Sequence, residues 1–155
     1  QVRGTSMFRG YWNRPDADIE AFDGDWFRTG DAAYLDEDGF LFIVDRIKDM
    51  VIRGGENIGC GRVEAALVEH PIVVEACVYS VPDERLGEEV GATVYVSDEL
   101  KDSDLREFLE DRLAHFEVPR YFEFQQAPLP RIASGKVAKR AIQAAARQKL
   151  LGNVA

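Results

Sequence analysis

The sequence contains only two cysteines, Cys60 and Cys77, and only two histidines, His70 and His115. It has no Cys-x-x-Cys pair, so the ligand spacing of a structural zinc site is absent. Cys60 is not flanked by a histidine or another base that would make it a nucleophile. We therefore expect no metal site. We expect both cysteines to be free thiols in a reducing compartment, the cytoplasm.

Positive charge and long apolar runs are also scarce. The chain carries 19 Lys and Arg against 28 Asp and Glu, a net charge of −9. This charge argues against nucleic acid as a main ligand, because neutralising a phosphate backbone requires a basic surface. A nucleotide bound in a local pocket needs only a few cations and stays compatible with it. No apolar run approaches the roughly 20 residues that span a membrane. At 46% hydrophobic and 30% charged residues, the chain is typical of a globular protein.

The first 44 residues are rich in aromatic side chains and turn residues. Asp36 to Gly39 (DEDG) predicts a turn between the strands Ala33–Leu35 and Phe40–Val44, so we expect β-hairpins and loops here. Aromatic rings bury much surface, and so short a segment cannot bury them all by itself. We therefore expect a partner domain to cover the aromatic residues, which are Phe8, Tyr11, Trp12, Phe22, Trp26 and Phe27.

After Asp45 the pattern changes to alternating strands and helices. Ser103 and Asp104 are candidate N-caps of a helix with an apolar stripe from Leu105 to Leu113, and Ser134 is expected to start the last helix. Together these segments predict a small α+β domain with a mostly antiparallel sheet flanked by helices. The expected strands are Asp49–Arg53, Val73–Val81, Val90–Val96 and Tyr121–Phe124; the expected helices are Gly61–Glu69, the Leu105–Leu113 segment and Val137 to about Leu150.

Three motifs follow one another along the chain: Asp25–Asp31 (DWFRTGD), Asp45–Ile58 (DRIKDMVIRGGENI) and Ser134–Lys136 (SGK). In this order they resemble the C-terminal part of an acyl-CoA synthetase, a member of the adenylate-forming, AMP-binding enzymes. The resemblance implies that the chain is the tail of a larger enzyme. Residues 1–45 would end the large adenylating domain, and residues 46–150 would form its mobile C-terminal domain. The partner is then the enzyme's own N-terminal domain.

The resemblance also implies a two-step reaction. A carboxylic acid and ATP form an acyl-adenylate and pyrophosphate, and the acyl group then passes from AMP to the thiol of CoA. Both steps build negative charge on oxygens, which fixed cations and backbone amides stabilise. ATP or AMP and CoA are the expected ligands. Mg²⁺ is expected in the full-length enzyme, although no residue identified here would bind it.

Asp31 and Arg46 are the candidate nucleotide-binding residues. A carboxylate after the turn residue Gly30 can accept both hydroxyls of a ribose, and the planar guanidinium of Arg46 suits ribose or phosphate oxygens. The family resemblance assigns both to the nucleotide. The alternatives are an ordinary turn aspartate, and a surface salt bridge of Arg46 with Asp45 or Asp49.

The second motif holds three further candidates. The resemblance places Lys48 at the family's hinge, Gly55 beside the pantetheine tunnel for CoA, and Asn57 near the nucleotide phosphates. Glycine lets the backbone approach a ligand closely. The alternatives are a solvated lysine at position 48 and a simple Gly-Gly hairpin turn at Gly54-Gly55.

Lys136, at the expected start of the last helix, is the candidate catalytic residue. The resemblance gives it the task of neutralising charge between the acyl carboxylate and the α-phosphate. The alternative is an exposed lysine in the first helical turn, which the helix dipole disfavours.

The region after Ile58 departs from the commoner family pattern. Gly59 to Glu64 (GCGRVE) stands where many members have Tyr-Pro and an acidic-apolar-acidic triplet, and two glycines should loosen this helix entry. The Gly-Gly-Glu-Asn-Ile sequence favours an acid–CoA ligase for fatty or aromatic acids. An adenylation domain that loads a carrier protein, and a non-catalytic interaction module, stay open as alternatives. The isolated chain is expected to be inactive.

Overall fold

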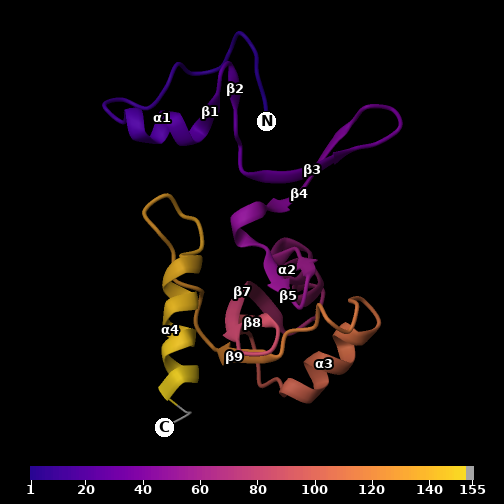
Figure 1. Cartoon of the computed structure of the whole chain (residues 1–155). Coiled ribbons are helices and arrows are strands. Elements are labelled where there is room, and N and C mark those ends of the chain that lie inside the picture. The colour runs from indigo at the N-terminus through magenta and orange to yellow at the C-terminus, as the bar shows by residue number, and fades with distance from the viewer. Residues whose placement is uncertain (153–155) are drawn as a thin grey trace. The chain divides into compact units, whose positions relative to one another are not determined.

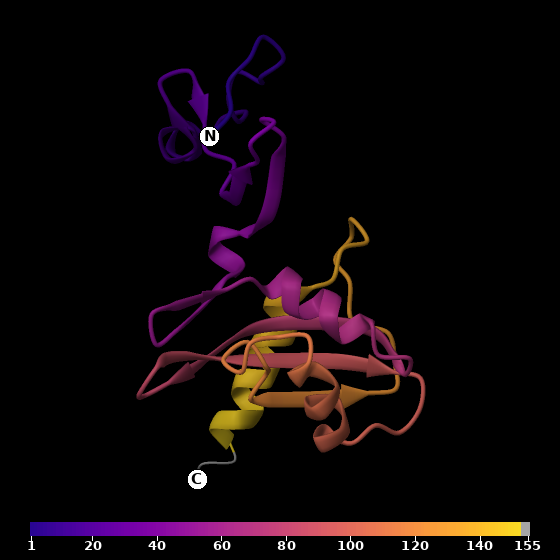
Figure 2. The same ribbon diagram turned by 90° about the vertical axis from the view of Figure 1, so that its right-hand side faces the viewer.

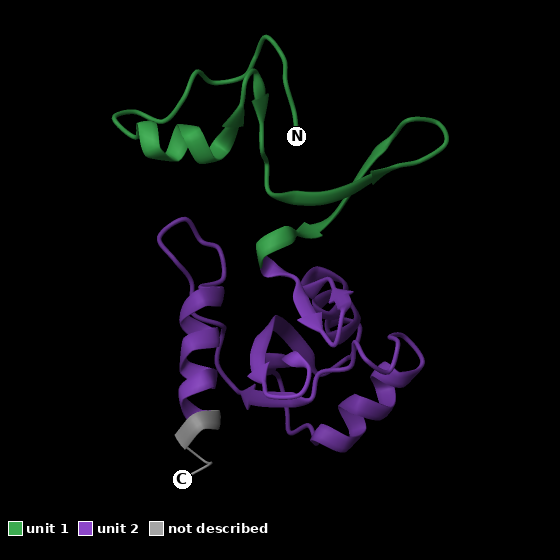
Figure 3. Ribbon diagram, in the orientation of Figure 1, with its two compact units in different colours: residues 1–48 green, residues 49–155 purple. Residues whose placement is uncertain are grey.

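The computed structural model describes residues 1–152 (Figure 1). The chain divides into two compact units, unit 1 from Gln1 to Lys48 and unit 2 from Asp49 onward (Figure 3). Among the described residues, no helix combines the length and the apolar character that crossing a lipid bilayer requires.

Unit 1 consists mainly of two short hairpins, as the sequence predicts. Strands β1 (Phe22–Asp23) and β2 (Trp26–Phe27) form the first. Strands β3 (Asp31–Leu35) and β4 (Leu41–Arg46) form the second. The turn between β3 and β4 follows from its residues: Asp36 Oδ1 accepts hydrogen bonds from the amides of Asp38 and Phe40 at 3.1 and 2.8 Å, and Gly39 has φ +84°.

A helix in unit 1 was not expected. It is α1 (Pro15–Ala21), with Pro15 in its first turn and two acidic residues, Asp16 and Asp18, beside it. Proline at the first helical position and acidic residues in the first turn are helix-start signals. In this chain the helix-start signals lie within the aromatic-rich first segment, and the aromatic residues led us to expect strands and loops.

The β3–β4 hairpin exposes apolar side chains on both of its faces. Each of these large residues is between 44% and 67% exposed: Tyr34, Leu35, Phe40, Leu41, Phe42, Ile43 and Val44. An isolated two-stranded hairpin is at best marginally stable in water. A contiguous apolar patch of this kind usually marks a contact surface.

Unit 2 is built on a five-stranded sheet. Its strands are β5 (Val51–Arg53), β6 (Glu56–Ile58), β7 (Val73–Asp83), β8 (Gly87–Val96) and β9 (Tyr121–Gln125). Their order is β6-β5-β8-β7, with β9 also paired to β8. Among the strands of the described residues 1–152, only β8 and β9 pair in parallel. The mostly antiparallel sheet flanked by helices is therefore confirmed.

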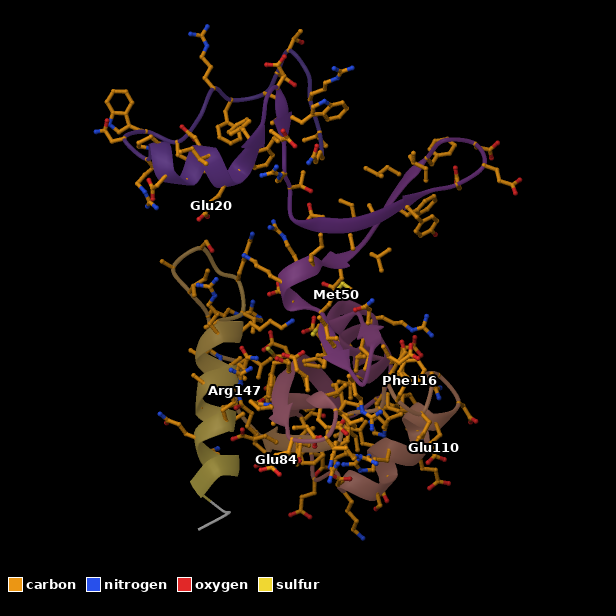
Figure 4. The ribbon with its side chains drawn as sticks, viewed as in Figure 1. Glu20, Met50, Glu84, Glu110, Phe116 and Arg147 are labelled. Carbon is orange, nitrogen blue, oxygen red and sulfur yellow. The ribbon has the colours of Figure 1, made fainter. Side chains whose placement is uncertain are left out.

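Helices cover both faces of this sheet (Figure 1). Helices α2 (Cys60–Val68) and α3 (Asp102–Glu110) pack on one face, and α4 (Lys139–Gly152) packs on the other. The alternation of β7 makes this possible, since Val78 faces the α2 side while Cys77 and Tyr79 face α4. On α4, Arg147 and Gln143 donate hydrogen bonds to Ser80 of β7, and Arg147 is labelled in Figure 4.

Two helix starts differ from the prediction. Helix α3 begins at Asp102 with Lys101 in the N-cap position and no side-chain cap, so Ser103 and Asp104 are not its caps. Helix α4 begins at Lys139 instead of following Ser134 directly. The reason is that Val137 is already paired with Arg131 in an isolated β-bridge, which closes a loop before the helix can start.

The two cysteines are buried thiols. Cys60 is 0% exposed and its Sγ lies 2.6 Å from the Asp49 carbonyl oxygen. Cys77 is 2% exposed, and burial, followed by the nearby Glu64, raises the pKa of its thiol to about 12. Because only a thiolate is nucleophilic, Cys77 should be inert in the folded chain.

We predict that iodoacetamide at pH 8 leaves Cys77 unmodified in the native chain and alkylates it rapidly in denaturant. Mass spectrometry of tryptic peptides measures this for each cysteine. Rapid alkylation of Cys77 without denaturant would show that β7 and α4 do not pack as described.

Candidate functional site

Asp31 and Arg46 lie side by side in unit 1. They face each other in the register of β3 and β4, and Arg46 Nε lies 2.9 Å from Asp31 Oδ1. Arg46 also donates a hydrogen bond from Nη1 to the Thr29 carbonyl at 3.3 Å. Gly30, with φ +75°, turns the chain so that its carbonyl accepts the Ile47 amide at 2.9 Å. The two candidate nucleotide-binding residues thus form an ion pair across the β3–β4 hairpin.

This arrangement corrects the alternative considered for Arg46. Arg46 forms an ion pair with Asp31 across the hairpin, whereas the sequence suggested its neighbours Asp45 and Asp49. The Asp31 side chain is 22% exposed and that of Arg46 is 52% exposed, so the pair is open to solvent on one side. Such a pair offers a vicinal diol a carboxylate acceptor and a guanidinium donor together.

Gly54 and Gly55 form the tight turn of the β5–β6 hairpin in unit 2. Their φ angles are +58° and +95°, which suits a turn with two left-handed residues. A Cβ at Gly54 would lie 3.1 Å from Leu86 Cδ2, whereas one at Gly55 would meet no atom within 4 Å. The hairpin-turn reading is correct for the local structure, and Gly55 keeps free space beside it.

This hairpin is fixed to the turn between β7 and β8. The Gly54 amide donates to the Leu86 carbonyl at 2.9 Å, and the Ile52 amide donates to Glu88 Oε2 at 2.8 Å. Arg53 Nε lies 2.8 Å from Glu89 Oε2, and Glu89 is only 1% exposed. The sequence reasoning missed this buried ion pair, since the two residues are 36 positions apart.

Asn57 lies on β6, opposite Ile52, with an exposed side chain. That side chain makes no hydrogen bond within residues 1–152, so its amide is available to a ligand.

Lys136 lies in an exposed loop between β9 and α4, three residues before the helix starts. The expected position at the helix start is therefore wrong, and with it the argument that the helix dipole disfavours this lysine. The Ile132 amide donates to the Lys136 carbonyl, and the Gly135 amide donates to the Ile132 carbonyl, both at 2.9 Å. These bonds define a small hairpin-like loop that presents Lys136 to solvent.

The structure does not bring Gly55 and Lys136 together. In Figure 2 the β5–β6 hairpin, in magenta, and the loop that carries Lys136, in orange, lie at opposite ends of unit 2. Asp31 and Arg46 belong to unit 1.

Lys48 is the last residue of unit 1 and the middle residue of the short 3-10 helix η1 (Ile47–Asp49). The boundary between the units thus lies between Lys48 and Asp49, three residues beyond the boundary expected after residue 45.

The departure from the family pattern after Ile58 does not prevent helix formation. Helix α2 starts at Cys60, with Gly59 in the N-cap position. Arg62 pairs with Glu117 at 3.1 Å, and Glu64 Oε1 accepts the Val78 amide at 2.9 Å. These tertiary contacts of Arg62 and Glu64 hold the start of α2 in place despite Gly59 and Gly61.

No group of three or more His, Cys, Asp or Glu side chains within residues 1–152 is arranged to hold a metal ion.

Comparison with known proteins identifies relatives along almost the whole chain. Residues 62–136 match the AMP-binding enzyme C-terminal domain. A long-chain-fatty-acid–CoA ligase of Mycobacterium tuberculosis is 39% identical over 140 residues, which are 89% of this chain and 27% of the relative. A 2-succinylbenzoate–CoA ligase of Bacillus velezensis is 42% identical over 136 residues, covering 88% of this chain and 28% of the relative. The chain therefore spans little more than a quarter of these relatives.

Solved structures also match about nine tenths of the chain. An o-succinylbenzoate CoA synthetase of Bacillus subtilis, in complex with its acyl-adenylate intermediate, gives a TM-score of 0.85 at 35% identity, over 91% of this chain and 29% of that one. An amide bond synthetase of Marinactinospora thermotolerans gives 0.82 at 38% identity, over 92% of this chain and 29% of that one.

Proposed function

This chain belongs to the adenylate-forming, AMP-binding enzymes, of which it is a C-terminal part, and on that premise we propose that the full-length protein is an ATP-dependent acid–CoA ligase. It would convert a carboxylic acid and ATP into an acyl-adenylate and pyrophosphate, and then transfer the acyl group to the thiol of CoA. Relatives named as ligases for a fatty acid and for 2-succinylbenzoate support a fatty or aromatic acid as the substrate.

One geometric observation carries the proposal. Unit 2 carries the loop before α4 and the β5–β6 hairpin at opposite ends (Figure 2), and it joins unit 1 after Lys48. A single fixed arrangement would not bring both ends to the same nucleotide. Two successive half-reactions, each served by one end of unit 2 after a rotation at Lys48, account for both features.

In the first half-reaction, a carboxylate oxygen attacks the α-phosphorus of ATP and pyrophosphate leaves. We assign Asp31 to the ribose hydroxyls, with Arg46 held against it. Lys136 would approach with its ammonium group and neutralise the charge that gathers between the acyl carboxylate and the α-phosphate. Asn57 lies on the β5–β6 hairpin, so it would donate its amide to the nucleotide phosphate in the arrangement that serves the second half-reaction.

In the second half-reaction, the thiolate of CoA attacks the acyl carbon and AMP leaves. We assign the Gly54-Gly55 turn to the pantetheine tunnel, since the space beside Gly55 is open and the fixed hairpin would keep it so. Mg²⁺ would accompany ATP in the full-length enzyme, held by groups outside the residues discussed here.

Unit 1 fits the end of a larger domain. The exposed apolar faces of the β3–β4 hairpin need a cover, and the preceding part of the full-length chain would supply it. This assignment agrees with a chain that spans less than a third of its relatives.

The test is an acid-dependent assay of the full-length protein with ATP. We expect pyrophosphate release with fatty or aromatic acids, followed by thioester formation with free CoA. The carrier-protein alternative predicts transfer to a phosphopantetheinyl carrier instead, and an amine acceptor is a useful third arm because of the similarity to an amide bond synthetase. If no acid leads to pyrophosphate release, the ligase proposal fails and the non-catalytic interaction module is the remaining interpretation.

We predict that the 155-residue chain alone makes no acyl-adenylate and binds ATP weakly. Asp31, Arg46 and Lys136 would supply only one wall of the site. Pyrophosphate release from the purified chain, with the same panel of acids, would contradict this prediction. It would also contradict the premise that the rest of the active site lies outside these 155 residues.

A further inference from the structure

The loop that carries Lys136 has few contacts of its own. Residues 131–136 are all exposed, and the Lys136 side chain makes no hydrogen bond or ion pair with the described residues 1–152. A catalytic group must be held within a fraction of an ångström of its productive position. An exposed loop with a glycine next to the lysine does not provide that by itself. Whatever orders this loop therefore decides how well Lys136 can act.

Arg131 spans the base of the loop. Its Nη1 donates a hydrogen bond to the carbonyl of Gly135, the residue directly before Lys136, at 2.9 Å. Its Nη2 donates to the Glu75 carboxylate. Arg131 is also the partner of Val137 in the bridge that closes the loop. One guanidinium thus ties the backbone next to Lys136 to the Glu75 carboxylate.

Glu75 is itself fixed to the core. It lies on β7, its side chain is 22% exposed, and its Oε2 accepts the amide of Leu129 at 2.9 Å. Leu129 is 2% exposed and packs with the core between α4 and the sheet. A continuous path therefore runs from β7 through Glu75 and Arg131 to the backbone beside Lys136.

We propose that Arg131, held by Glu75, is a positioning residue for Lys136. This inference rests on the proposed function for the role of Lys136, but the geometric part concerns this chain alone. An arginine suits both partners, because its planar fork donates to a carboxylate and a carbonyl at once from fixed positions. A lysine at 131 would keep the charge and reach one of the two.

The first experiment uses the 155-residue chain, which contains the loop and both anchors. Arg131→Lys and Glu75→Gln should lower the {¹H}–¹⁵N heteronuclear NOE of the Gly135 and Lys136 amides, while the thermal midpoint of unit 2 stays within a few degrees. The pair is partly exposed, with 47% of the Arg131 side chain and 22% of the Glu75 side chain open to solvent, and ion pairs of this kind add little to stability. An unchanged NOE at Gly135 and Lys136 overturns the proposal, whatever the enzyme does.

Arg112→Lys is the matched control. Arg112 likewise joins a carboxylate, Glu69 at 3.1 Å, to a backbone carbonyl four residues away, that of Phe108 at 2.7 Å. It does not touch the Lys136 loop. Its replacement should leave the NOE values of Gly135 and Lys136 as they are. A loss of order there in Arg112→Lys would mean that the loop responds to any loss of an arginine fork.

The second experiment uses the full-length enzyme and a double-mutant cycle. Arg131→Lys should lower the kcat of adenylation about ten- to a hundred-fold with the KM for ATP unchanged, since misplacement of a catalytic group costs rate. In a Lys136→Ala background it should cause no further loss. A further loss there would mean that Arg131 contacts the substrate itself, and would overturn a positioning role.

The outcomes separate the two proposals. If Lys136→Ala adenylates normally, the proposed function of Lys136 fails, while the loop measurement still decides whether Arg131 orders the loop. If the loop keeps its order in Arg131→Lys, the positioning inference fails, while Lys136 can still be catalytic.

Discussion

Replacing Lys136 by alanine in the full-length enzyme is expected to slow acyl-adenylate formation by roughly 10²–10³-fold, the usual cost of losing a group that stabilises developing charge. The lysine is exposed on the loop before α4, three residues ahead of the helix start, and its side chain has no hydrogen-bond or ion-pair partner among the described residues. Removing it therefore leaves no buried charge behind, and the loss should appear in the rate and not in stability. Pyrophosphate release at saturating acid and ATP measures the first half-reaction.

Transfer to CoA from preformed acyl-adenylate should be changed far less, because Lys136 lies at the opposite end of unit 2 from the Gly54-Gly55 turn. Lys101→Ala is the matched control, since Lys101 is also an exposed lysine of unit 2 and precedes α3. It should leave both half-reactions intact. Equal losses of both half-reactions in Lys136→Ala would contradict the assigned role.

Much of the fold could be predicted because its signals are local. The Asp36–Gly39 turn depends on one aspartate side chain and one glycine with a positive φ. The strand β7 packs on a core with each of its faces, and the continuous apolar run from Ala76 to Tyr79 is the direct consequence. Such features need no knowledge of distant residues, so the sequence pattern predicts them well.

What failed were features decided by tertiary contacts. The start of α4 is shifted because Val137 pairs with Arg131, and no helix-start signal contains that pairing. Neighbours in sequence suggested Asp45 or Asp49 as partners of Arg46, whereas the register of β3 and β4 selects Asp31.

The supports of the candidate site were also invisible in the sequence. Glu89 holds Arg53 from 36 positions away, and Glu75 holds Arg131 from 56 positions away. Motifs name the residues that meet a ligand, because those residue types are demanded by the ligand's chemistry. The residues that hold them in place are chosen by the fold, and only the structure reveals them.

Replacing Lys48 by proline is expected to leave adenylation largely intact and to suppress thioester formation. Lys48 is the middle residue of η1, at the boundary of the two units. Residues of a 3-10 helix have φ of about −50° to −70°, and the proline ring fixes φ near −65°. Proline thus suits the φ expected at position 48, although it disfavours the helical region for Ile47 before it, and it removes the freedom to change φ at position 48. If unit 2 rotates about Lys48 between the half-reactions, one of them must fail.

We expect thioester formation to be the one that fails, because the family resemblance implies an extended linker in the adenylating arrangement. The measurement compares pyrophosphate release with acyl-CoA formation in the same variant. Lys48→Ala is the control, since it removes the ammonium group and leaves the backbone free; it should retain both half-reactions. If Lys48→Ala loses thioester formation as severely as Lys48→Pro, the side chain is what matters and the hinge assignment is wrong.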